Sequence, residues 1–92
     1  MIISFRDKES ENLFHRKRVK RFQSFDQQAL KRLVFLNAAT SLEALRANPS
    51  NKLHALGGDR QEEYAIWINT QWRLCFEWRD GNAYEVTIVD YH

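Results

Sequence analysis

Apolar and polar residues alternate along residues 71–79, and this pattern restricts the C-terminal part of the chain to extended structure. One side of the run carries Trp72, Leu74, Phe76 and Trp78, and the other carries Arg73, Cys75 and Glu77. Successive side chains point to opposite faces of a strand, so a repeat of two residues predicts a strand with one buried face. Asp80-Gly81 follows as a strong hairpin signal, and residues 82–90 are predicted to form the returning strand.

Two further strands are predicted upstream of this hairpin. Residues 52–56 form a short strand that Gly57-Gly58-Asp59 ends, and residues 63–69 form a second one in which the alternation is clear. At the N-terminus, residues 1–5 are interpreted as a short strand and residues 7–15 as a first helix.

Two segments of the capping-box type mark the other helices. In Ser24-Phe25-Asp26-Gln27 a hydroxyl is followed three residues later by an amide, and a helix of about 13 residues is predicted to follow. Thr40-Ser41-Leu42-Glu43 repeats the pattern and begins a short helix that ends before Asn48-Pro49. Lys31 and Arg32 are expected to face away from the core. The apolar residues at helical spacing are expected to face it: Ala29, Leu30, Leu33, Val34 and Leu36.

This order of elements predicts an α+β fold that occupies residues 1–92 as one domain. A short N-terminal strand is followed by two to three helices and then by a four-strand antiparallel meander. Antiparallel sheets commonly have one face packed and one face exposed to water. We therefore expect the helices to cover one face of the sheet and a functional site to lie on the other.

Length, hydropathy and cysteine content limit the classes of protein to which the chain can belong. A chain of 92 residues suits one domain with a modest core. Apolar runs are short, and no charged segment leads into a long apolar one, so neither a membrane span nor a signal peptide is predicted. Cys75 is the only cysteine, which excludes an internal disulfide and a thiolate metal site, and a cytoplasmic location is expected.

Positive charge is concentrated in the first part of the chain. Residues 1–36 contain nine Lys/Arg and four Asp/Glu, a balance of +5, whereas residues 37–92 contain five and eight, a balance of −3. The peak is the segment of residues 15–21, here called the basic stretch, whose cations are Arg16, Lys17, Arg18, Lys20 and Arg21. Such a segment can neutralise several phosphates without reading sequence, or it can be a solvated loop.

Several side chains suited to RNA cleavage occur on or near the predicted sheet: His54, Arg73, Asp90, Tyr91 and His92. Histidine can act as acid and as base near neutral pH, and the planar arginine fork suits a phosphate. RNA supplies its own nucleophile, the 2′-hydroxyl, so the protein needs a base, an acid and a cation, and neither a metal nor a cofactor is expected. The residues alone leave an RNase, a binding module and a structural domain open.

Each of these residues also has a structural interpretation. Arg73 can be solvated, or can pair with Glu77 or Glu85, instead of binding a phosphate. Asp90 can pair with Arg73, orient a histidine or end the strand, and Tyr91 can stack on a base or fill a gap in the packing. The three tryptophans are interpreted as core or sheet-face residues and not as base-stacking platforms: Trp67, Trp72 and Trp78.

Three segments of the chain resemble the HigB toxins of the RelE/ParE toxin–antitoxin superfamily. Residues 52–60 (KLHALGGDR) are similar to a KLHPLKGDR-like segment of that family, and residues 72–76 (WRLCF) are similar to its NWRITF-like strand. Residues 80–92, which end in Asp90-Tyr91-His92, are similar to its NGDAY…DYH ending. The resemblance covers essentially the whole chain and is strongest from Lys52 onward.

The resemblance implies a RelE-like fold and a ribosome-dependent endoribonuclease that cleaves mRNA in the ribosomal A site. It implies that Arg73 stabilises the phosphate and that the other active-site positions are His54, Asp90, Tyr91 and His92. It also implies that RNA is contacted by the basic stretch, with Lys52 and Arg60 as further cations. The implied partners are a helix-turn-helix antitoxin of the HigA type, the ribosome and mRNA, with DNA reached only through the antitoxin complex and no membrane involved.

Two positions depart from the family pattern. Ala55 and Gly57 stand where many relatives have proline and lysine, so one positive charge near the scissile phosphate is missing. This leaves open whether Lys52 or Arg60 compensates or cleavage is slow. Two other functions also stay open: a ParE-like poison of DNA gyrase, a branch that generally lacks the histidine pair, and a non-catalytic RNA-binding module that works through the basic stretch.

Overall fold

The computed structural model describes residues 1–58 and 62–91, which form three α-helices, two short 3₁₀ segments and one four-stranded sheet. The helical elements are α1 (Lys8–Phe14), η1 (Lys20–Phe25), α2 (Asp26–Ala38), α3 (Leu42–Arg46) and η2 (Pro49–Asn51), and the strands are β1 (His54–Ala55), β2 (Glu63–Trp67), β3 (Trp72–Arg79) and β4 (Asn82–Asp90). The strands pair antiparallel in the order β1-β2-β3-β4. The predicted α+β fold is confirmed.

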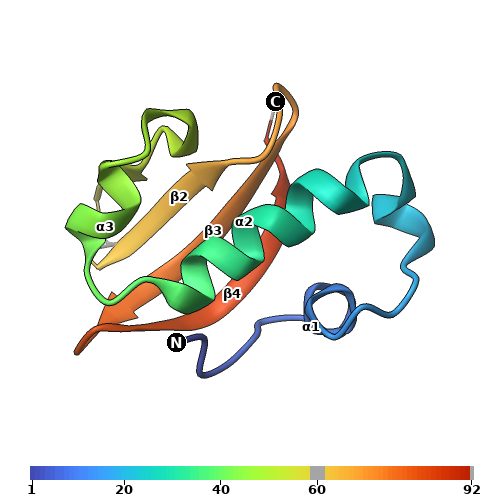
Figure 1. The fold of residues 1–92 in the computed structure, drawn as a ribbon, viewed down its shortest axis with the longest axis horizontal. Helices are drawn as coiled ribbons and strands as arrows, with labels where there is room; N and C mark the ends of the chain where they lie inside the picture. The colour runs from blue at the N-terminus through green and yellow to red at the C-terminus, as the bar shows by residue number, and fades with distance from the viewer. Residues whose placement is uncertain (59–61, 92) are drawn as a thin grey trace.

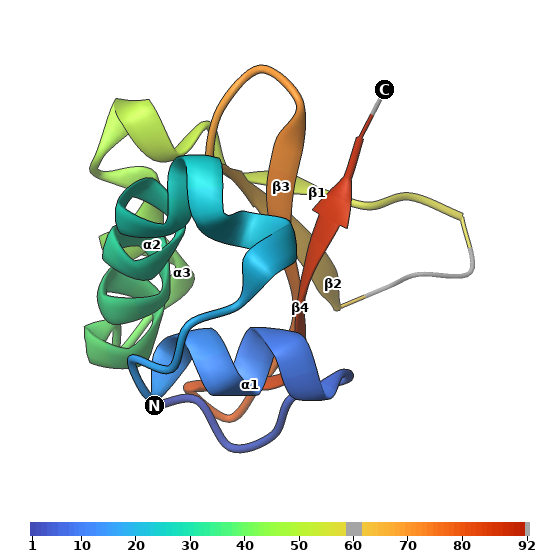
Figure 2. The same ribbon diagram turned by 90° about the vertical axis from the view of Figure 1, so that its right-hand side faces the viewer.

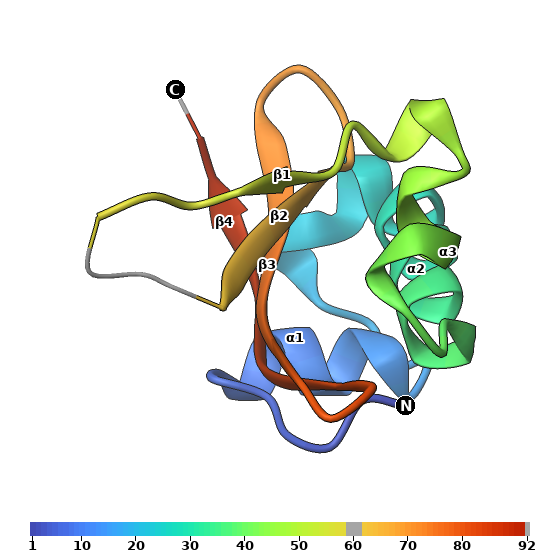
Figure 3. The same cartoon turned by 90° about the vertical axis from the view of Figure 1, so that its left-hand side faces the viewer.

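The helices α2 and α3 lie on one side of the sheet, and α2 crosses it diagonally (Figure 1). The two side views show that, within the described residues, no helix covers the opposite side over β1, β2 and β3 (Figures 2 and 3). This uncovered side is here called the open face. Among the residues that the structure describes, no helix has the length and apolar character needed to cross a membrane.

The β3–β4 hairpin follows the sequence prediction closely. Asp80 and Gly81 both have positive φ, 52° and 79°, as a tight turn of type I′ requires. Further along, the register shifts between Cys75 and Glu77, where Glu85 is the extra residue of a bulge with φ of 53°. The turn residues therefore determine how β3 and β4 pair next to the turn, and the bulge then shifts the pairing register further along the two strands.

Residues 1–5 do not form the predicted strand. They make only two isolated parallel bridges to β4, Ile2 with Ala83 and Phe5 with Val86. The bulge at Glu85 lies between these bridges and interrupts the ladder, and Ser4 Oγ accepts a hydrogen bond from the Glu85 N–H there. The segment still covers the outer edge of β4, which would otherwise be open to pairing with another chain.

The start of α1 is tied to β4 by a buried network of hydrogen bonds. Asp7, the N-cap of α1, accepts from the Ser10 N–H at 2.9 Å and from the Thr87 hydroxyl at 2.7 Å. Ser10 is fully buried, and its hydroxyl donates to Asp7 and accepts from the Ile88 N–H at 3.0 Å. Residues 1–6 pair with the first part of β4. Beyond it, the side chains of Asp7 and Ser10 accept hydrogen bonds from Thr87 and Ile88 at the same edge.

We expect Ser10→Ala to lower the free energy of unfolding by about 1–3 kcal/mol, because the buried Ile88 N–H would lose its acceptor. Urea unfolding measures the change. Ser24→Ala is the matched control, since Ser24 is exposed and its substitution should change stability by about 0.5 kcal/mol or less. Equal unfolding midpoints for the two variants would show that water replaces the Ser10 hydroxyl.

The helix starts differ from the two predicted capping boxes. No side chain caps α2, because η1 runs directly into it and Phe25 is the N-cap residue. Side chains three residues apart eclipse in a 3₁₀ helix, so η1 buries Phe22 and Phe25 together. At α3 the cap is Ser41 and not Thr40, and its hydroxyl accepts from the Ala44 N–H at 3.1 Å. The helix of 13 residues and the end of α3 before Asn48-Pro49 are confirmed.

Arg32 lies in the core side of α2, contrary to the prediction that it faces away. The buried residues of α2 are Ala29, Arg32, Leu33 and Leu36, a stripe at positions i, i+3, i+4 and i+7, whereas Val34 is 39% exposed. The Arg32 guanidinium donates to Asn51 Oδ1 at 2.6 Å and to Ser50 Oγ at 3.2 Å. Burial lowers the pKa of Arg32 from its ordinary value. The residue thus joins α2 to η2.

The first two strands are shorter than predicted. β1 contains only His54 and Ala55, because Lys52 adopts a left-handed conformation with φ of 46° that strands do not accommodate. β2 ends at Trp67, before the predicted end at Asn69. There the Asn69 side chain accepts from the N–H groups of Gln71 and Trp72, and this local hydrogen bonding makes the turn into β3.

Candidate functional site

The strand register places the side chains of the open face in three cross-strand rows. The first, here called the cationic row, contains Lys52, Trp67, Arg73 and Val89; the second contains His54, Ala65, Cys75 and Thr87; and the third, the acidic row, contains Glu63, Glu77 and Tyr84. Directly paired residues share a face of the sheet. Lys52 precedes β1 and joins its row because its ammonium lies 4.6 Å from the centroid of the Trp67 ring.

Hydrogen bonds to the turn between β2 and β3 hold the Arg73 side chain on the open face. One guanidinium nitrogen, Nη1, donates to the carbonyl oxygens of Asn69 at 2.6 Å and of Trp72 at 3.1 Å. The predicted alternatives, pairing with Glu77 or Glu85, are wrong: Glu77 pairs with Arg79 at 3.4 Å, and Glu85 accepts from the Ser4 hydroxyl. Within the described part of the chain, these hydrogen bonds of Arg73 involve Nη1, and none of them involves its Nε or Nη2 donors.

Tyr91 lies beside Arg73, just beyond the end of β4. The centroid of its ring is 5.3 Å from the Arg73 Cζ, and the side chain is 43% exposed. Its backbone N–H donates to the Gln71 carbonyl at 2.6 Å, which fixes the start of the C-terminal tail against the β2–β3 turn. Tyr91 therefore does not fill a gap in the core. It presents an aromatic ring next to the guanidinium.

Asp90 is the last residue of β4, and its side chain lies on the side of the sheet opposite to Arg73 and Tyr91. Its partner in the register is Trp72, which packs against Phe22 and Phe25 beneath the helices. Alternation along the strand therefore places the Asp90 side chain on the helix side of the sheet, opposite to Arg73. Its carboxylate accepts from Gln71 Nε2 at 3.1 Å. Asp90 is the last residue of β4, as one of its three predicted roles requires. The orientation of His92 stays a prediction, because His92 lies outside the described residues.

His54 is exposed on the open face at the β1 edge of the sheet. Its Nδ1 lies 3.5 Å from the Lys52 carbonyl oxygen. β1 and β3 are separated by β2, so the backbones carrying His54 and Arg73 lie about 10 Å apart across the sheet. The two side chains therefore reach the open face from different strands. His92 and Arg60, the other predicted site residues of this region, lie outside the described residues.

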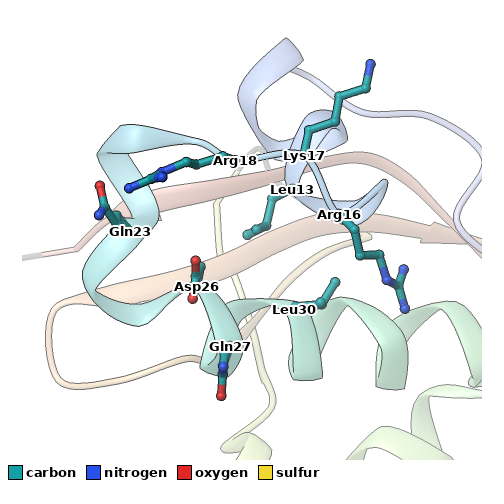
Figure 4. A pocket seen from close by; sticks show the side chains of 8 residues that line it. All are labelled: Leu13, Arg16, Lys17, Arg18, Gln23, Asp26, Gln27 and Leu30. Atoms are coloured by element: carbon teal, nitrogen blue, oxygen red, sulfur yellow. The ribbon is translucent and has the colours of Figure 1, made fainter.

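The basic stretch lies on the helix side of the molecule, away from the open face. Three of its cations line a hollow of about 450 Å³ between the end of α1 and the start of α2: Arg16, Lys17 and Arg18. Figure 4 shows these side chains extending in different directions from the loop. Arg21 contacts other residues of the protein: it pairs with Glu9 at 2.8 Å, and its Cζ lies 5.3 Å from the centroid of the Trp72 ring. The structure thus divides the predicted RNA-binding residues between two surfaces.

Two of the three tryptophans pack against core aromatic rings, and the third lies on the open face. Trp72 stacks on Phe25 with ring centroids 4.7 Å apart, and Trp78 packs edge-on against Phe76, as predicted for core residues. Trp67 is a sheet-face residue, half-buried in the cationic row directly opposite Arg73. Its pairing with Lys52 was missed by the sequence analysis, although the two residues stand on opposite sides of the predicted Gly57-Gly58-Asp59 turn.

The family assignment follows from comparison with protein-family models. Residues 3–92 match the model described as "RelE-like toxin of type II toxin-antitoxin system HigB". The chain belongs to the HigB-like toxin family. The match spans the sheet, the helices and the whole open face, so the resemblance inferred from three short segments is confirmed.

Two curated HigB relatives are similar to this HigB-like toxin. Endoribonuclease HigB of Proteus vulgaris is 36% identical over 61 residues, which cover 66% of this chain and 65% of that protein, slightly less than two thirds of its length. Toxin HigB-1 of Vibrio cholerae is 32% identical over 94 residues, which cover 100% of this chain and 98% of that protein.

Solved structures share the fold at low sequence identity. The YoeB dimer from Staphylococcus aureus has a TM-score of 0.58 and 22% identity, and covers 100% of this chain and 97% of that one. The YoeB/ParE toxin from Agrobacterium tumefaciens has a TM-score of 0.52 and 13% identity, with 99% and 96% covered. The YoeB–YefM complex from Staphylococcus aureus has a TM-score of 0.51 and 18% identity, with 100% and 98% covered. These likenesses establish a RelE-type toxin fold.

Proposed function

We propose that this HigB-like toxin is an endoribonuclease that cleaves mRNA on the ribosome without a metal ion and so stops translation. The observation that carries the proposal is the placement of Arg73, whose guanidinium is clamped by two backbone carbonyls on an exposed face shared with Lys52, His54 and Tyr91. The name of the Proteus vulgaris relative, an endoribonuclease, supports the same activity.

The chemistry needs only groups that the chain supplies. The 2′-oxygen of RNA attacks the adjacent phosphorus while the bond from phosphorus to the 5′-oxygen breaks, giving a 2′,3′-cyclic phosphate and a 5′-hydroxyl. Arg73 stabilises the negative charge that grows on the phosphate. His54 and His92 carry out the two proton transfers, from the 2′-hydroxyl and to the 5′-oxygen.

Tyr91 and Asp90 act around this centre. Tyr91 holds the RNA beside Arg73 through its exposed ring. Asp90 has a positioning role, since its carboxylate is bound by Gln71 and lies on the other side of the sheet from Arg73. Lys52 supplies a cation to the cationic row, and it is proposed to compensate for the family lysine that Gly57 replaces.

The proposed partners follow from the family. A type II toxin is held inactive by an antitoxin, which we propose to be of the HigA helix-turn-helix kind, so that DNA is reached only through that complex. The basic stretch, with Lys20 exposed at its end and Arg16, Lys17 and Arg18 around the hollow, would contact ribosomal RNA. These partners place the toxin in the cytoplasm.

Primer extension on a defined mRNA tests the proposal, with programmed ribosomes and with free RNA. Wild type is expected to cleave only on ribosomes, and His92→Gln is expected to lose cleavage because one of the two proton transfers fails. His15→Gln is the matched control: it removes an exposed histidine that is not one of the cations proposed to contact ribosomal RNA, and it should keep full cleavage.

Three outcomes would contradict the proposal in different ways. Equal cleavage of free RNA would remove the ribosome from the mechanism. Full activity of His92→Gln would reject the site assignment. Intact mRNA accompanied by DNA damage in growing cells would favour poisoning of DNA gyrase, which the RelE-type fold alone does not distinguish from RNA cleavage.

A further inference from the structure

We propose that Trp67 forms a base-stacking subsite for single-stranded RNA, with Lys52 beside it as a phosphate contact. The proposal rests on the proposed function, because it assigns to the same RNA strand a second point of attachment next to Arg73. It changes the interpretation of Trp67 from a residue of the sheet face to one that binds a nucleobase.

The placement of Trp67 supports this role. It is the direct register partner of Arg73, and partners on one face have Cβ atoms about 5 Å apart. Tyr91 lies on the other side of Arg73 with its ring 5.3 Å from the guanidinium carbon. Arg73 therefore stands between the strand residue Trp67, its register partner, and Tyr91, whose ring its guanidinium contacts. An RNA strand whose phosphate meets Arg73 can place neighbouring bases on the two rings.

The contact between Lys52 and Trp67 places an exposed, flexible side chain over one face of the indole. The Lys52 side chain is exposed, yet its ammonium lies 4.6 Å from the centroid of the indole. A lysine has a flexible stem and a strongly hydrated charge, so it can turn from the ring to a phosphate when a base takes its place. Aromatic platforms interleaved with cations are the usual means of binding single-stranded nucleic acid.

The distribution of charge on the open face sets the path of the strand. The acidic row carries Glu63 and Glu77, to which Arg6 lies at 3.2 and 3.9 Å. Arg6 and Arg79 neutralise these carboxylates, so the acidic row offers a phosphate backbone no net attraction, whereas the cationic row attracts one. RNA is therefore expected to run along Lys52, Trp67, Arg73 and Tyr91 and to avoid the far end of the face.

The acidic row also provides a matched control. Tyr84 is a half-buried aromatic residue of the same face, and its ring lies 4.1 Å from the guanidinium carbon of Arg79. It repeats the pairing of a ring with a cation that Trp67 makes with Lys52, but in a row whose charges are balanced by ion pairs. Loss of this ring should leave RNA binding unchanged.

The test is an equilibrium titration of labelled full-length toxin with ribosomes programmed by an mRNA whose A-site codon carries 2′-O-methyl groups, which remove the nucleophile. Trp67→Leu is expected to weaken binding about tenfold, the usual effect of losing one stacked base, while Trp67→Phe keeps most of the affinity. Tyr84→Leu should bind like wild type. Abasic nucleotides placed singly in and around the codon should include one position that weakens wild type about tenfold and has no further effect on Trp67→Leu.

The outcomes separate this proposal from the proposed function. Equal affinity of Trp67→Leu and wild type, or abasic effects of the same size in both proteins, would reject the base subsite even if wild type cleaves unmodified mRNA. A Trp67-dependent loss of binding in a protein that cleaves no mRNA would support the subsite and reject the endoribonuclease. If the same abasic position also had no effect on Trp67→Phe, the result would support the subsite and show that the base stacks on the whole indole and not on a phenyl ring.

Discussion

Replacement of Arg73 by alanine is expected to slow mRNA cleavage on the ribosome by about 10²–10³-fold, the usual cost of removing a preorganised donor from a developing oxyanion. The clamp explains why the group is preorganised: two carbonyl oxygens hold Nη1, so the guanidinium does not have to be ordered when RNA arrives. Single-turnover cleavage of a labelled mRNA on programmed ribosomes measures the change, with toxin in excess so that binding does not limit the rate.

Two other variants make this result specific. Arg73→Lys keeps the charge but loses the planar fork, and it should recover only part of the rate. Arg79→Ala removes an arginine from the same strand and face, where it pairs with Glu77, and should cleave at the wild-type rate. Thermal unfolding of all three checks that the β2–β3 turn survives. An Arg73→Ala protein that folds and cleaves normally would mean that another cation stabilises the phosphate.

The parts of the fold that the sequence predicts well are those that local chemistry decides. β4 begins at Asn82 and ends at Asp90 as predicted, because alternation fixes the strand and Asp80-Gly81 fixes the turn. The N-terminal strand was predicted wrongly because its pairing depends on a bulge near Glu85, about eighty positions away, which no local pattern reveals.

The misplacement of Arg32 has a different cause. The spacing of the α2 stripe does include position 32, but the charge of arginine favoured the opposite face, and apolar Leu30 and Val34 were counted toward the core instead. Periodicity and residue type disagreed there, and periodicity was correct. A buried arginine is tolerated because Asn51 and Ser50 accept its hydrogen bonds, and those partners lie far along the chain.

The sequence predicted which residues lie at the candidate site better than it predicted where their side chains point. The sequence indicated Arg73, Tyr91 and His54, and the register places all three on the open face. It did not reveal that Asp90 faces the helix side or that the basic stretch lies away from the sheet, because both depend on how strands and helices pack. Trp67 gave no signal of its own, since a tryptophan in an alternating strand fits a packed face equally well.

Arg32→Ala is expected to lower the free energy of unfolding by about 2–3 kcal/mol. The substitution removes the donor to Asn51 Oδ1, whose residue is only 1% exposed, and leaves that buried acceptor unsatisfied. It also removes the guanidinium whose Cζ lies 6.0 Å from the centroid of the Phe35 ring. Asn51 holds the Leu45 carbonyl through its Nδ2 at 2.9 Å, so the loss spreads to the α3–η2 corner. Chemical denaturation in urea measures the effect.

Lys31→Ala is the matched control for this change, because it deletes the neighbouring cation of the same helix, which is exposed and contacts the same Phe35 ring at 5.7 Å. Its stability should stay within about 0.5 kcal/mol of wild type. Since η2 leads directly into Lys52 and His54, Arg32→Ala should also reduce cleavage, whereas Lys31→Ala should not. If both variants lost equal stability, the general charge of α2 and not the buried hydrogen bond would be the stabilising feature.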